Sequence, residues 1–127
     1  MSELTTDDVI RRFNESFVQH DPDALDGLVA QDCVMESVGP APDGTRFEGR
    51  DACLRFWQEL ANDPNTSFEP EEIVVAADRA TIRWRVRFDR AAHPVFGDTQ
   101  VNSVRGVNLM RVRDGQIVEA LGYTKTP

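Results

Sequence analysis

No run of apolar residues in the sequence is long enough to cross a membrane, and the N-terminal stretch MSELTTDDVIRR lacks the apolar segment of a signal peptide. The only cysteines are Cys33 and Cys53. Two thiols in a chain without a signal peptide are typical of a reducing compartment. We therefore expect a cytoplasmic protein that has no membrane partner and whose cysteines are free and structural.

Basic charge is also scarce. The sequence has 14 Lys and Arg against 22 Asp and Glu, which gives a formal net charge of −8 and a pI of about 4.7. Nucleic acids and anionic membranes bind basic surfaces. This balance argues against both as main partners, and we expect no nucleic acid partner.

Several motifs that carry known chemistry are missing. The sequence has no HxxxH or CxxC pair for a metal ion, no Gly-rich phosphate loop and no GxSxG nucleophile elbow. We therefore expect no metal site and no cofactor.

What is present is an ordinary globular composition, with 40% hydrophobic and 28% charged residues in a chain of 127 residues. That length suffices to bury a substantial core. No internal repeat, low-complexity tract or linker divides the chain, so we predict a single domain over residues 1–127.

The periodicity of apolar residues predicts helices before strands. A capping sequence at Thr5-Thr6-Asp7-Asp8 precedes a helix that runs to about residue 20, Pro22 starts a short second helix, and a third is predicted over 51–62. Strands are predicted over 32–38, 45–48, 68–76, 79–88, 99–112 and 116–125. Helices followed by hairpins indicate an α+β fold with a mainly antiparallel sheet.

The clearest motif is a hairpin in which Asp114-Gly115 joins two alternating runs, because a tight primed turn needs positive φ. One face of this hairpin carries small or polar residues where a closed core would carry Leu or Phe. These residues are Gly106, Asn108, Ala120 and Gly122. Either this face leaves room for a pocket, or helices pack closely over the glycines.

Aromatic and apolar residues on the neighbouring elements are candidates for the wall of such a pocket. Trp84 and Val86 share the inward face of the strand over 79–88. A flat apolar or aromatic ligand fits walls of this kind. The predicted ligand-binding residues are Phe13, Met35, Trp57, Trp84, Val86, Gly106, Ala120 and Gly122.

The order of these elements, together with DPDALDGL from residue 21, FEGRDA from residue 47 and RVRDGQI from residue 111, resembles a known family. It is similar to the nuclear-transport-factor-2-like (NTF2-like) superfamily, in its SnoaL-like and ketosteroid-isomerase-like branch. The resemblance implies a cone in which a strongly curved sheet wraps three N-terminal helices and a hydrophobic pocket opens at one end. It also implies a homodimer joined through the outer sheet surface.

The catalytic positions of two relatives fall on unsuitable residues. By similarity to ketosteroid isomerase, its Tyr falls on Phe13, its Asp base on Ser37 and its oxyanion Asp on Asn108. Of these, only Asn108 can still donate a hydrogen bond to an oxyanion. The last-strand Asp of limonene epoxide hydrolase falls on Gly122. The chain therefore resembles the scaffold without either active site, and whether it is an enzyme stays open.

Two functions remain. One is a cofactor-independent isomerase, cyclase or dehydratase acting on a small apolar carbonyl compound, with Glu36, or Ser37 with a water, moving the proton and Asn108 steadying the enolate oxygen. The other is a non-catalytic protein that binds a small apolar or aromatic ligand. Glu36 and Ser37 face opposite sides of a strand, so only one of them can point into the pocket unless a bulge intervenes. If Glu36 lies outside, it pairs with an arginine of the sheet.

The opposite face of the hairpin carries Val107, Leu109, Ile117 and Leu121 between arginines. Such a face is too apolar to be left to water, and it predicts a homodimer. His20, at a predicted helix end, is expected to be structural, and His93 lies in a loop from which it could overhang the pocket.

Overall fold

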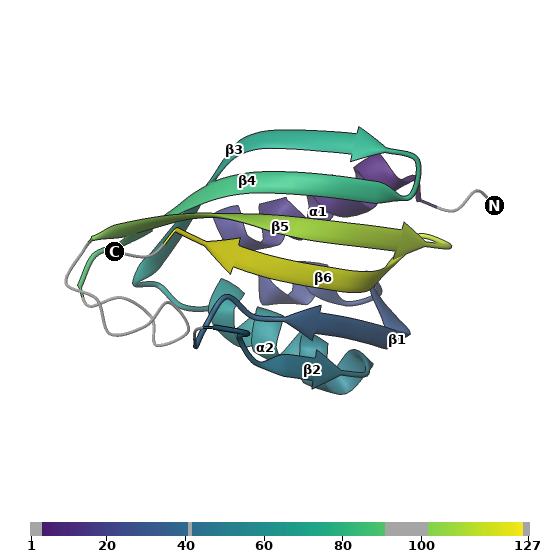
Figure 1. The fold of residues 1–127 in the computed structure, drawn as a ribbon, viewed down its shortest axis with the longest axis horizontal. Helices are drawn as coiled ribbons and strands as arrows, with labels where there is room; N and C mark the ends of the chain where they lie inside the picture. The colour runs from purple at the N-terminus through teal and green to yellow at the C-terminus, as the bar shows by residue number, and fades with distance from the viewer. Residues whose placement is uncertain (1–3, 41, 91–101, 126–127) are drawn as a thin grey trace.

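The computed structural model describes residues 4–40, 42–90 and 102–125. A curved six-stranded sheet, in the order β2-β1-β6-β5-β4-β3, carries its helices on one face (Figure 1). The helices are α1 (Thr6–Val18), the 3₁₀ helix η1 (Pro22–Leu25) and α2 (Arg50–Ala61). The strands are β1 (Val29–Glu36), β2 (Arg46–Glu48), β3 (Thr66–Ala76), β4 (Arg79–Phe88), β5 (Ser103–Arg113) and β6 (Gln116–Thr124).

The predicted α+β fold class is confirmed, with a mainly antiparallel sheet in which only the β1–β6 pair is parallel. The second of the three expected helices is only a four-residue 3₁₀ turn. It is short because the chain turns into β1 at Val29, three residues before the predicted strand. In the described part of the chain, no helix is long and apolar enough to span a membrane.

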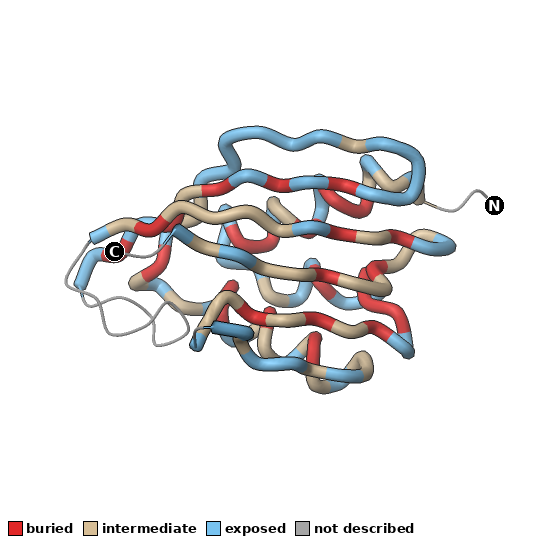
Figure 2. Tube along the Cα trace, in the orientation of Figure 1, coloured by how far each residue is buried: buried red, intermediate tan, exposed pale blue. Residues whose placement is uncertain are grey.

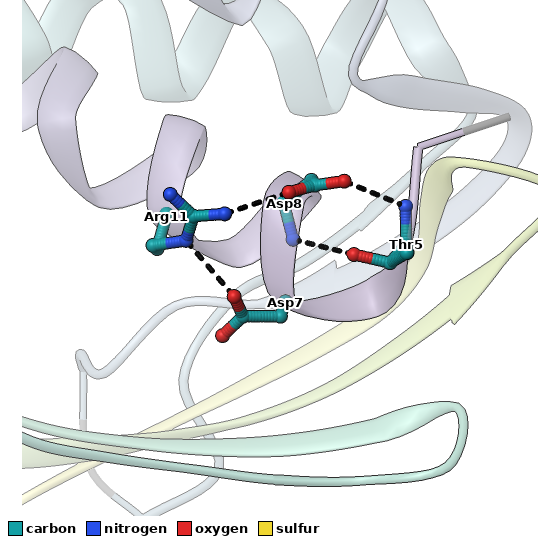
Figure 3. Close-up of polar contacts among 4 residues, drawn as sticks. All are labelled: Thr5, Asp7, Asp8 and Arg11. Carbon is teal, nitrogen blue, oxygen red and sulfur yellow. Dashed lines mark hydrogen bonds and ion pairs between the residues drawn. The ribbon is translucent and has the colours of Figure 1, made fainter. Parts of the chain in front are cut away.

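The N-terminus of α1 is fixed by a reciprocal capping box (Figure 3). The backbone N–H of Asp8 donates to the Thr5 hydroxyl, and the Thr5 N–H donates to the Asp8 carboxylate, both at 3.1 Å. Arg11, one turn later, pairs with both Asp7 and Asp8. These contacts satisfy donors that the first helical turn leaves without partners.

The β5–β6 hairpin has the predicted primed turn, since Asp114 and Gly115 have φ values of 54° and 76°. A bulge then shifts the register, because Arg111 pairs with Glu119 while Val112 pairs with Ile117. The bulge turns Ile117 into the core, where it is completely buried. The prediction that Ile117 lies on the outer face is therefore wrong.

The core lies between the helices and the inner face of the sheet. Along β4, buried and exposed residues alternate, whereas the edge strand β3 is exposed along most of its length (Figure 2). Cys33 and Cys53 are buried free thiols. Burial raises the pKa of both, so they stay protonated and unreactive near neutral pH.

Candidate ligand pocket

A cavity of about 70 Å³ lies between the inner face of the sheet and helices α1 and α2. Its walls are mainly aromatic and aliphatic. The lining residues are Phe13, Asn14, Phe17, Met35, Glu36, Ser37, Val38, Phe56, Trp57, Leu60, Phe68, Pro70, Trp84, Asn108, Ala120 and Gly122. The cavity is far smaller than the roughly 300–1,000 Å³ pockets of drug-sized ligands, so it leaves no room for a four-ring steroid.

The aromatic wall is a chain of edge-to-face contacts. Phe13, on α1, meets Trp57 of α2 at 5.1 Å between ring centroids and Phe17 at 5.0 Å. Phe17 continues to Phe68 at 5.1 Å, and Phe68 to Trp84 at 6.3 Å. The rings therefore join both helices to β3 and β4, and this arrangement holds the cavity's shape by geometry that aromatic quadrupoles favour.

Trp84 brings the first polar group into this wall. A Cβ atom at Gly106 would lie only 2.5 Å from Cζ2 of Trp84, so the indole occupies the space above that glycine. Its Nε1 donates to Oδ1 of Asn108 at 3.2 Å. This bond orients the amide and commits its oxygen. Within the described residues, Nδ2 of Asn108 has no acceptor and is left to donate.

Asn14 is a lining residue that the sequence analysis missed. Its Nδ2 is buried and has no hydrogen-bond partner among the described residues. The signal was available in the sequence, because Asn14 follows Phe13 on the same helical stripe as Ile10 and Phe17. A polar residue on the buried side of an amphipathic helix calls for a partner.

Glu36 and Ser37 take opposite sides of the sheet. Met35 and Ser37 are buried, whereas the Glu36 carboxylate lies 3.6 Å from the Arg46 guanidinium and its side chain is 34% exposed. Arg46 is the direct partner of Glu36 across the β1–β2 ladder, so both side chains point outward. Glu36 is therefore a lining residue whose carboxylate is held by Arg46 on the outer side of the sheet.

Ser37 points inward, but its hydroxyl is already used. It donates to the Gly39 carbonyl at 2.8 Å and accepts from the Thr45 N–H at 3.1 Å. The side chain therefore ties the end of β1 to the loop before β2. A hydroxyl held in this way has no spare proton for a ligand.

The cavity brings together most of the predicted site residues. The three catalytic candidates border it, as do Phe13, Met35, Trp57, Trp84, Ala120 and Gly122. Two predicted lining residues are not among those that form its wall. Val86 is completely buried in the core, and Gly106 lies under the Trp84 ring. The sequence pattern placed both on the inner face but could not show which side chain would cover them.

His20 is not among the residues that line this cavity. Nδ1 of His20 lies 3.0 Å from the carbonyl oxygen of Ala61, at the C-terminus of α2. His93 lies outside the described residues. Among the residues that the structure describes, no group of three or more His, Cys, Asp or Glu side chains could hold a metal ion.

The comparison with protein families matches residues 10–120 to the SnoaL-like domain. The chain belongs to this family. Its fold is NTF2-like, as the sequence resemblance implied. A comparison with curated proteins gave no match.

Solved structures support the same assignment. An NTF2-like protein of unknown function from Mesorhizobium loti is 52% identical, with a TM-score of 0.84, covering 95% of this chain and 91% of its own. IdmH from Streptomyces antibioticus, a provisionally assigned polyketide cyclase, is 28% identical with a TM-score of 0.70 and covers 94% and 91%. A provisionally assigned ketosteroid isomerase from Kribbella flavida shares the fold, at 17% identity with a TM-score of 0.74, covering 96% and 78%.

Proposed function

We propose that this SnoaL-like protein binds a small, flat, largely apolar ligand in the cavity between the sheet and the helices, and that it holds this ligand without acid–base chemistry of its own. The observation that carries the proposal is the position of Glu36. It is the only titratable residue among the described residues that border the cavity, and its carboxylate pairs with Arg46 on the outer face. A general base must reach the proton it removes.

The cavity's chemistry supports a binding role. Aromatic edges from Phe13, Trp57 and Trp84 offer a flat ligand a large apolar contact, and the Asn108 amide offers one oriented donor. This pairing of apolar walls with a few placed polar groups is typical of small-molecule sites. The volume favours one ring system over a four-ring steroid.

A second candidate is a cyclase or isomerase of the polyketide-cyclase type. It is favoured by the similarity to IdmH and by the unpaired Nδ2 of Asn108, which could stabilise an enolate oxygen as negative charge develops on it. In this case the proton would have to pass through water or through the substrate, because the described lining offers no base that points inward.

Binding and catalysis are separated by Glu36→Gln. Tryptophan fluorescence, which reports on Trp57 and Trp84 in the wall, would be titrated with ketosteroids and aromatic polyketide precursors, and turnover of each would be followed in parallel. We expect wild type and Glu36→Gln to bind the same compounds with the same affinity and no turnover. A reaction that Glu36→Gln abolishes would overturn the proposal and make Glu36 catalytic.

We also propose that the protein acts in the cytoplasm as a homodimer. The two buried free thiols suit a reducing compartment. The outer sheet face, with Leu109 and Tyr123 exposed, suits a second copy.

A further inference from the structure

Asn14 carries a polar atom that the folded protein does not satisfy. Its Nδ2 is buried and unpartnered within the described residues, although it lies on the cavity wall. The nearby Ser16, by contrast, is fully accommodated, because its hydroxyl donates to the Phe13 carbonyl at 2.6 Å. Burying an amide donor without an acceptor costs stability, and such exceptions in native proteins need an explanation.

A ligand is the natural source of the missing acceptor. Asn14 and Asn108 both line the cavity, on α1 and on β5, and each has an amide nitrogen without an acceptor in the described part of the chain. The oxygen of Asn108 is occupied by Trp84, and the hydroxyl of Ser37 is occupied by its loop. These two amide nitrogens are therefore donors that the wall can still offer to a ligand.

The charge of the wall limits the ligand further. No Arg or Lys is among the described residues that line the cavity, and the Glu36 carboxylate lies outside it. A carboxylate ligand would be desolvated there without a counter-ion, which is costly. A neutral acceptor such as a ketone, quinone or ester oxygen meets the donors without that cost.

We propose that Asn14 is a ligand-contacting specificity residue that donates a hydrogen bond to a neutral carbonyl oxygen. This inference rests on the proposed binding function and adds the chemical class of the ligand. In the ligand-free protein the amide is a burden on stability, and the bound carbonyl relieves it. Asn14 therefore lowers the stability of the ligand-free protein and increases its affinity for a carbonyl ligand. A residue with a purely structural role would not lower the stability.

The first arm of the test measures binding with three probes of similar shape: acetophenone, ethylbenzene and benzoate. We expect wild type to bind acetophenone most tightly and benzoate least. Asn14→Leu should weaken acetophenone about tenfold and leave ethylbenzene unchanged, which is the loss expected for one hydrogen bond. Asn14→Ala, which adds no bulk, should also lose the preference for acetophenone over ethylbenzene.

The second arm measures the melting temperature of the ligand-free variants. Asn14→Leu should melt at a higher temperature than wild type, because it removes an unsatisfied donor. Asn108→Leu, the matched control, should melt at a lower temperature, because it removes the acceptor of the Trp84 indole.

The outcomes separate the two proposals. If no probe binds wild type, the binding function fails and this inference fails with it. If all three probes bind and Asn14→Leu weakens acetophenone and ethylbenzene equally, binding stands and the role of Asn14 is overturned. A lower melting temperature for Asn14→Leu would also overturn it, by showing that the amide is structural.

Discussion

Gly106 and Gly122, on neighbouring strands, were both predicted to open space for a ligand, but the structure uses them differently. The room above Gly106 is taken by the ring of Trp84. Gly122 keeps its place on the cavity wall, opposite Asn108 across the β5–β6 ladder. A glycine on the inner face therefore leaves space above its backbone. The neighbouring residues decide whether a side chain or a cavity fills that space.

Gly122→Ala should disturb the cavity directly. The added Cβ would lie 2.9 Å from Cγ1 of Val38 and 3.3 Å from Oδ1 of Asn108. We expect a loss of about 1–3 kcal/mol in the free energy of unfolding, which is typical of overpacking, together with weaker ligand binding. Urea denaturation and fluorescence titration would measure the two effects. Leu121→Ala, on the outward side of the same strand, should leave affinity unchanged, and a Gly122→Ala protein with wild-type affinity would contradict the placement.

At the scale of elements, local sequence signals account for most of the helices and turns that form. The capping box starts α1, and the Asp114-Gly115 turn joins β5 to β6. The outer ladder is held by pairs such as Arg87 with Glu69 and Arg105 with Glu71. These pairs occupy several of the arginines that the sequence places on the outer face.

The capping box should give the protein a measurable dependence on pH. Hydrogen bonds from the Thr5 backbone and side chain hold the pKa of Asp8 below its ordinary value of 3.8. A carboxyl whose folded pKa is depressed stabilises the fold above the unfolded pKa, and this contribution is lost as the pH falls through the folded value. Asp8→Asn should therefore lower the melting temperature at about pH 7, and that difference should shrink as the pH falls below 3.8.

Thr5→Ala is the control for this prediction. It removes the hydroxyl that caps the helix and should cost about 1 kcal/mol at neutral pH. A gap between wild type and Asp8→Asn that stayed constant down to low pH would show that the charge of Asp8 does not contribute.

At the scale of the whole molecule, the outer sheet face exposes large apolar side chains. Leu109 is 42% exposed and Tyr123 is 51% exposed, and Val107 and Leu121 lie beside them. Arg83, Arg87 and Arg105 on this side are paired with glutamates of β3. Pairing within the chain leaves an apolar surface between the charges, which suits a second copy of the same face.

We therefore expect light scattering at micromolar concentration to give about twice the chain mass of 14.3 kDa. Leu109→Asp should shift the protein toward the monomer, because two copies of the face would bring the new charges together without partners. Val18→Asp, a change of an exposed apolar residue on α1, on the opposite side of the sheet, is a matched control that should remain a dimer. A wild-type monomer would remove the dimer proposal and leave the cavity unaffected.

The sequence by itself determined the fold class, the order of the strands along the chain, the first helix and the hairpin turn, because those depend on local periodicity, caps and positive φ. Tertiary structure decided the rest. The bulge opposite Arg111 moved Ile117 inward, and pairing with β2 sent Glu36 outward. The residues that line the cavity depend on which side chains of β1, α1 and β5 come together. These contacts cannot be predicted from the spacing of residues along the chain. In the sequence, Asn14 is therefore recognisable only as a polar residue on the buried stripe of a helix. That its amide nitrogen lacks a hydrogen-bond partner is seen only in the tertiary structure.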